Sequence, residues 1–88
     1  MAQHNAAELL MLMRAATPLA DLPTAEERRR IRIAAGFTQQ DVADAVDATQ
    51  KAVSLWEAGH SVRVRALRRP YLTVLAAMRT RANESAAA

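Results

Sequence analysis

The run TQQDVADAVDATQKAVSLWEAG (38–59) constrains the fold of this chain more than any other stretch. Thr38 can cap a helix, with Asp41 three positions later completing a capping-box pair, and Thr49 can cap another. The dipeptide at 47–48 interrupts the apolar pattern between them. The run therefore predicts two short helices that cross at a tight turn.

Apolar residues give each of these helices an inward face at helical spacing. They are Val42, Ala45 and Val46 in the first helix and Val53 and Trp56 in the second. In the second helix Gln50, Lys51, Ser54 and Leu55 point elsewhere. When two helices meet at a large angle in this way, the second can enter the major groove of DNA with its N-terminal residues at base edges. The pattern thus predicts a DNA-reading element.

Motifs at the ends of the two helices carry a family resemblance. RRRIRIAAGFTQ (28–39) contains a helix, a glycine stop and a capped helix start, and WEAG (56–59) has the form W-E-x-G. Ala43 falls where the two helices would cross and only a small side chain fits. Together these features resemble the helix-turn-helix of the phage repressor and Cro type, often called Xre-type. Asp47 departs from the pattern, since the family usually has a left-handed glycine there, but aspartate tolerates that conformation.

The resemblance implies a fold and a set of site residues. The fold is an all-α, compact five-helix lambda-repressor-like domain with an extra N-terminal helix and a helix-turn-helix at about 38–57. The implied base-reading residues are Gln50, Lys51 and Leu55, with Ser54 in a second tier, and the implied backbone contacts are Thr38, Gln39, Thr49, Arg63 and Arg65. Arg32 and Glu57 should form a partly buried pair. The chemistry is suitable, because glutamine pairs with adenine, lysine reaches guanine acceptors, and leucine packs on a thymine methyl.

Charge is distributed unevenly along the 88 residues, whose net charge is +3. The first 47 residues have five arginines and seven acids, a net −2, whereas the rest has seven basic and two acidic side chains, a net +5. The basic half contains the second helix of the motif. Such a face suits DNA, since neutralising phosphates supplies non-specific affinity.

The remaining segments predict one helical domain with additions at each end. Residues 1–22 should form an N-terminal helix, capped by Asn5 and running to about 16, followed by a linker. Residues 23–82 should form the DNA-binding domain, in which Thr24 caps a helix that stops at Gly36, and a loop of about ten residues leads to Pro70 in the first turn of the last helix. Residues 83–88 should form a flexible tail.

Other functions find little support in the sequence. Cysteine is absent, neither histidine has metal-site or catalytic spacing, and no cofactor motif occurs, so we expect neither an enzyme nor a metal protein. The five apolar residues 9–13 are too few to span a membrane, and we expect a cytoplasmic protein. A homodimer is expected if the stripe of Leu9, Leu12 and Met13, with the 71–78 stripe, packs on a second copy rather than on the chain's own core. The alternative to a transcriptional regulator such as a repressor is an adaptor or antitoxin that uses the same fold to bind a protein.

Overall fold

The structure, a computed structural model, describes residues 6–87, with side chains to Ser85, and in that range it is all-α with five helices and no strand. The helices are α1 (Ala6–Arg14), α2 (Ala25–Ala35), α3 (Gln39–Val46), α4 (Gln50–Glu57) and α5 (Arg65–Ala87). The all-α expectation is therefore confirmed. The Asn5 cap lies outside the described residues.

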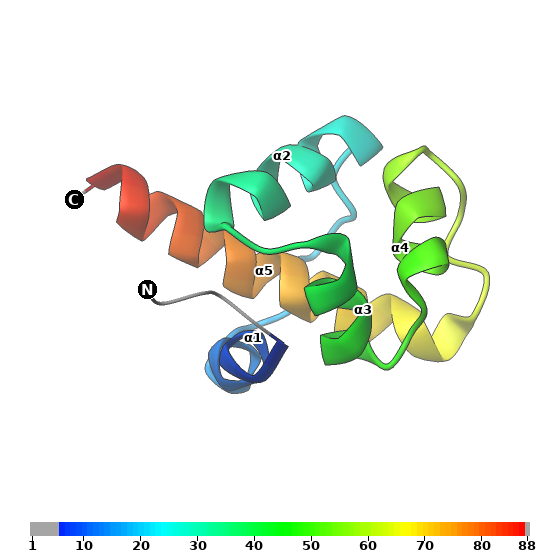
Figure 1. Cartoon of the computed structure of the whole chain (residues 1–88), viewed down its shortest axis with the longest axis horizontal. Coiled ribbons are helices and arrows are strands. Elements are labelled where there is room, and N and C mark those ends of the chain that lie inside the picture. The colour runs from blue at the N-terminus through cyan, green and yellow to red at the C-terminus, as the bar shows by residue number, and fades with distance from the viewer. Residues whose placement is uncertain (1–5, 88) are drawn as a thin grey trace.

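The long helix α5 runs through the length of the molecule, which measures 36 × 23 × 22 Å. In Figure 1, α2 lies on one side of α5 and α1 on the other, while α3 crosses in front and α4 lies beside α3. Four side chains of α5 form the centre of the core: Tyr71, Val74, Leu75 and Met78, each at most 1% exposed. The two short helices α3 and α4 are thereby held on a rigid support.

Helix α1 is part of this core rather than a free surface helix. Leu9 is completely buried, and Leu12 and Met13 pack against the core beside it. Glu8 also forms a 2.8 Å salt bridge with Arg81 of α5. The stripe expected to contact a second copy is therefore used within the chain, as is the 71–78 stripe. A homodimer stays a prediction, and Leu12 and Met13 are only partly buried.

The last helix differs from expectation at both ends. It begins at Arg65, so the preceding loop is shorter than predicted and Pro70 lies in the second turn of α5. Proline is tolerated there because its missing N–H removes only the bond to the Ala66 carbonyl, close to the helix start. The stretch 83–87, predicted as a flexible tail, is helical, which agrees with its alanine content.

Two polar groups are buried where α2 meets α5. Arg28 is 6% exposed, and its guanidinium carbon lies 5.8 Å from the centre of the Tyr71 ring, which also stacks at a tilt on Trp56 with centroids 4.7 Å apart. Neither Nε and Nη1 of Arg28 nor the Tyr71 hydroxyl has a hydrogen-bond partner among the described residues. Burial raises the pKa of Tyr71, and the nearby Arg28 cation opposes the increase.

Candidate nucleic-acid interface

Local sequence signals build the turn between α3 and α4. Asp47 adopts the left-handed conformation (φ 60°, ψ 47°), and the Ala48 N–H donates to the Ala43 carbonyl at 2.8 Å. Ala43 is completely buried where the helices approach each other. A larger side chain at that position would force α3 and α4 apart. The turn thus sets the angle at which α4 leaves the body of the protein.

Both helices begin at a threonine cap. Thr38 accepts from the Asp41 N–H and donates its own N–H to the Asp41 carboxylate, both at 3.0 Å, which completes the predicted capping box. Thr49 accepts from the Ala52 N–H at 3.1 Å. The first turn of each helix leaves other N–H groups free, and these favour an anion.

The first residues of the two helices contact each other directly. Gln50 of α4 donates its side-chain amide to the Gln39 oxygen of α3 at 2.6 Å, and Gln39 donates to Glu57 Oε1 at 3.1 Å. The start of α4 is therefore tied both to the start of α3 and to its own last residue.

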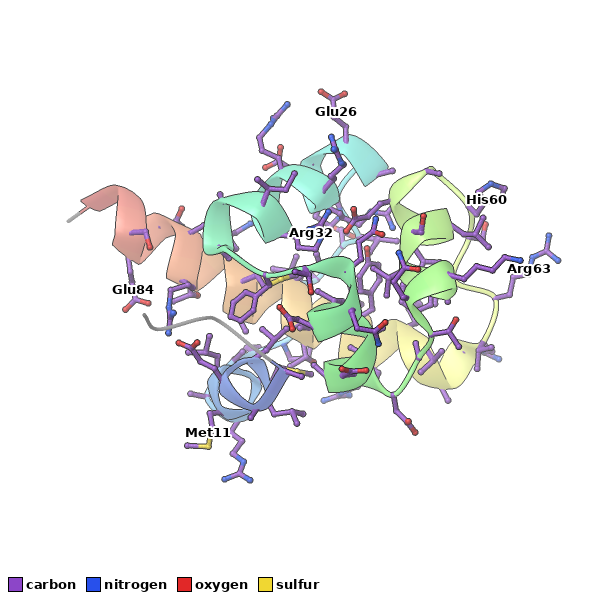
Figure 2. The ribbon with its side chains drawn as sticks, viewed as in Figure 1. Met11, Glu26, Arg32, His60, Arg63 and Glu84 are labelled. Carbon is purple, nitrogen blue, oxygen red and sulfur yellow. The ribbon has the colours of Figure 1, made fainter. Side chains whose placement is uncertain are left out.

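Glu57 is in turn paired with Arg32 of α2. The carboxylate accepts two hydrogen bonds from the guanidinium, from Nε at 2.6 Å and from Nη2 at 3.0 Å, while Nη1 donates to the Phe37 carbonyl at 2.9 Å. The Arg32 and Glu57 side chains are 11% and 5% exposed, and Figure 2 shows Arg32 pointing inward between α2 and α4. Bidentate pairs of this kind fix geometry as well as charge. A continuous hydrogen-bonded chain, here called the joint, runs through Arg32, Glu57, Gln39 and Gln50.

The outward face of α4 carries the predicted base-reading residues. Gln50 and Lys51 are exposed, Leu55 is 40% exposed, and Ser54 is half-buried one turn after Gln50. On the opposite face Val53 and Trp56 are buried in the core. The structure therefore brings all four predicted residues onto one surface, with Thr49 exposed at its edge.

The two arginines predicted to contact the DNA backbone lie in different surroundings. Arg63 lines a groove of about 360 Å³ beside α4, together with Leu55 and His60, and Figure 2 shows Arg63 and His60 extending away from the body of the protein. Arg65, two residues later, lines a separate groove with Pro18 and residues of α5. The structure thus brings Arg63 to the α4 surface but not Arg65.

Two residues that the sequence analysis did not select lie at the start of α3. Arg29 of α2 and Gln40 line an open depression of about 540 Å³ together with Thr38, Gln39 and Gln50. Arg29 could have been found from helical spacing, since it precedes Arg32 by three residues on the same helix. It adds an exposed cation beside two helix N-termini.

Several other kinds of site are absent from the described part of the chain. Within residues 6–87 no group of three or more histidine, cysteine or acidic residues could hold a metal ion, and no helix is long and apolar enough to cross a membrane. No family model, curated protein or solved structure gives a significant match to the chain. The geometry of α3, α4 and the joint is therefore the guide to function.

Proposed function

We propose that this protein binds double-stranded DNA sequence-specifically, with α4 in the major groove, and acts in the cytoplasm as a transcriptional regulator. One observation carries the proposal: Gln50 is exposed at the start of α4, yet its amide is held by Gln39 and through it by the buried pair of Arg32 and Glu57. A base-reading amide needs this combination of access and fixed orientation, because bidentate pairing with adenine is directional.

The neighbouring side chains of α4 support the same conclusion. Lys51 and Leu55 flank Gln50 on the exposed surface, and they offer a donor for guanine and an apolar group for a thymine methyl. Leu55 is 40% exposed, so its side chain is accessible for such a contact.

Positive groups lie where the DNA backbone would run. The free N–H groups at the starts of α3 and α4 favour phosphate oxygens. Arg29 lies beside the start of α3, and Arg63 lines the groove beside α4. The resemblance to the Xre-type helix-turn-helix, and to a lambda-repressor-like domain, adds support from the motifs of 28–59. Pairing of two copies over two half-sites would raise affinity.

A selection of duplexes from a random pool, at one fixed salt concentration, tests the proposal. We expect a consensus site, for which Gln50→Ala and Lys51→Ala each cost about 1 to 3 kcal/mol of specific affinity. Lys51→Ala should leave stability unchanged, whereas Gln50→Ala also removes the hydrogen bond to Gln39 and should lower stability by no more than about 1 kcal/mol. A pool that yields no enriched sequence would instead favour the adaptor or antitoxin alternative. Thr80→Ala, at an exposed position of α5 that lines none of these depressions, serves as the control and should leave the consensus affinity unchanged.

A further inference from the structure

We infer that a second surface, separate from the depressions beside α4, binds an acidic amphipathic segment of a partner protein. This surface, here called the basic groove, is formed by α1, the linker of residues 15–24 and the first turns of α5. It consists of two adjoining depressions. None of their lining residues lines either depression beside α4.

The first depression, of about 460 Å³, lies between α1 and α5 and is lined by Leu10, Met13, Arg14, Arg69, Pro70 and Thr73. The second, of about 520 Å³, is lined by Pro18, Arg65, Arg68, Arg69 and Leu72. Arg69 belongs to both and lies between them. Each depression therefore combines apolar residues with arginine side chains.

The sequence of α5 explains why the arginines gather on one side. Arg65, Arg68, Arg69 and Leu72 follow the spacing i, i+3, i+4, i+7, which places them on one face of the helix. Tyr71, Val74 and Met78 lie on a different face of α5, which is buried in the core. The linker is fixed beside the arginine face, because the Leu19 N–H donates to the Leu72 carbonyl at 3.3 Å.

The charge of the basic groove is uncompensated within the part of the chain that the structure describes. Arg14, Arg65, Arg68 and Arg69 are all exposed, and none forms a salt bridge with a carboxylate of residues 6–85. No acidic residue is among the described residues that line the two depressions. A single-signed surface of this kind attracts an oppositely charged partner.

The apolar residues of the basic groove indicate which anionic partner fits. Leu10 is 45% exposed at the rim of the first depression, and Leu72 and Pro18 line the second. A DNA backbone would leave these apolar surfaces empty, since phosphates and sugars supply no apolar side chain of matching size. A peptide helix with apolar anchors on one face and carboxylates beside them would fill both depressions and neutralise the arginines.

Three synthetic peptides of about 18 residues, long enough to become helical on binding, provide the probes. The first has leucines at i, i+3, i+4 and i+7 with glutamates at the flanking positions. The second is a sequence isomer without the leucine stripe, and the third replaces each glutamate by lysine. Fluorescence anisotropy with the whole chain should give binding of the first peptide at least about tenfold tighter than the isomer, and no binding of the lysine peptide.

Two charge-reversed variants with the same change in net charge separate the basic groove from the α4 surface. Arg14→Glu with Arg69→Glu should weaken the first peptide about tenfold or more and leave affinity for the selected duplex within about twofold. Arg29→Glu with Arg63→Glu should weaken binding of the selected duplex about tenfold or more and leave affinity for the first peptide within about twofold. If the first pair impairs folding, as judged by thermal unfolding, Arg14→Gln with Arg69→Gln gives the same comparison with a smaller change in charge.

Four results would overturn the inference. With the wild-type chain, these are failure of the first peptide to bind and binding of the isomer as tight as that of the first peptide. With the variants, they are an equal loss of peptide binding in both charge-reversed pairs, and a loss of DNA affinity in the pair at Arg14 and Arg69 as large as the loss in the pair at Arg29 and Arg63. The last result would make the basic groove a second DNA contact. The duplex selection is read separately, so the DNA-binding proposal stands or falls without the peptide.

Discussion

Arg28 and Arg32 lie one helical turn apart on α2, and both are largely buried, yet their surroundings are opposite. Arg32 has a bidentate carboxylate partner and a backbone carbonyl, whereas Nε and Nη1 of Arg28 have no hydrogen-bond partner among the described residues and its cation lies over an aromatic ring. Burial of a charge is costly unless hydrogen bonds and an opposite charge compensate it. Neighbouring positions on one helix should therefore respond to substitution with opposite signs.

The largest expected effect is at the carboxylate of the joint. Glu57→Ala leaves the buried Arg32 charge without its partner, and we expect the free energy of unfolding to fall by about 3 to 5 kcal/mol. DNA affinity should fall with it, because Gln39 loses its acceptor. Chemical denaturation measures the change, with Glu26→Ala, which removes an exposed partner of Arg30, as a control worth about 0 to 1 kcal/mol.

A double-mutant cycle with Arg32→Ala and Glu57→Ala isolates the coupling between the two residues. A coupling energy indistinguishable from zero would contradict the interpretation that the pair acts as a unit.

Removing the amide in the middle of the joint should have a smaller effect on stability than on binding. Gln39→Ala leaves the Arg32 and Glu57 pair intact but deletes one hydrogen bond to each of Glu57 and Gln50, at a cost of about 1 kcal/mol in stability. Gln50 becomes free to rotate, so we expect about tenfold weaker binding to the selected duplex. Equal losses for the selected and random duplexes would mean that Gln39 contacts the backbone rather than orienting Gln50.

At Arg28 the expected change has the opposite sign. Arg28→Met retains an unbranched apolar stem and removes a poorly compensated charge, but it also loses the contact of the cation with the Tyr71 ring. With both effects included, we expect a free energy of unfolding equal to that of the wild type or higher by up to about 2 kcal/mol. Arg32→Met is the matched control and should destabilise. A loss above about 2 kcal/mol in Arg28→Met would show that Arg28 has a compensating partner and would remove the contrast between the two positions.

The smallest effect is expected at Tyr71. Tyr71→Phe deletes a buried hydroxyl that has no hydrogen-bond partner among the described residues, so stability at neutral pH should change by less than about 1 kcal/mol. The raised pKa of Tyr71 means that the folded state holds its proton more tightly than the unfolded state. The contribution of Tyr71 to the free energy of unfolding should therefore be fully present below the ordinary tyrosine pKa of 10.0. It should be lost as the pH rises from there through the higher pKa that Tyr71 has in the folded state. An identical decline in Tyr71→Phe would assign the pH dependence to other groups.

Short-range features of the structure were predictable from the sequence. Thr38, Gly36 and Asp47 act on backbone groups within five residues, so the caps and turns follow from residue type and local geometry. The inward faces of α3 and α4 follow from helical periodicity in the same way. Residues 83–87, which we expected in a flexible tail, continue α5 in the structure, in keeping with the high helix propensity of alanine.

Apart from the pair of Arg32 and Glu57, which the family resemblance implied, contacts between distant residues were decided only by the tertiary structure. Gln39 meets Gln50 and Glu57 across 11 and 18 residues, and no local pattern specifies which of several polar side chains will pair. Arg63 and Arg65 are two residues apart in the sequence but enter different grooves, because the loop turns into α5 between them. The contrast between Arg28 and Arg32 has the same origin: α2 supplies two identical side chains, and the positions of α4 and α5 determine that one meets a carboxylate and the other a ring. Residue type and periodicity thus determined the helices and their faces, whereas packing of elements far apart in sequence determined which buried charges are compensated.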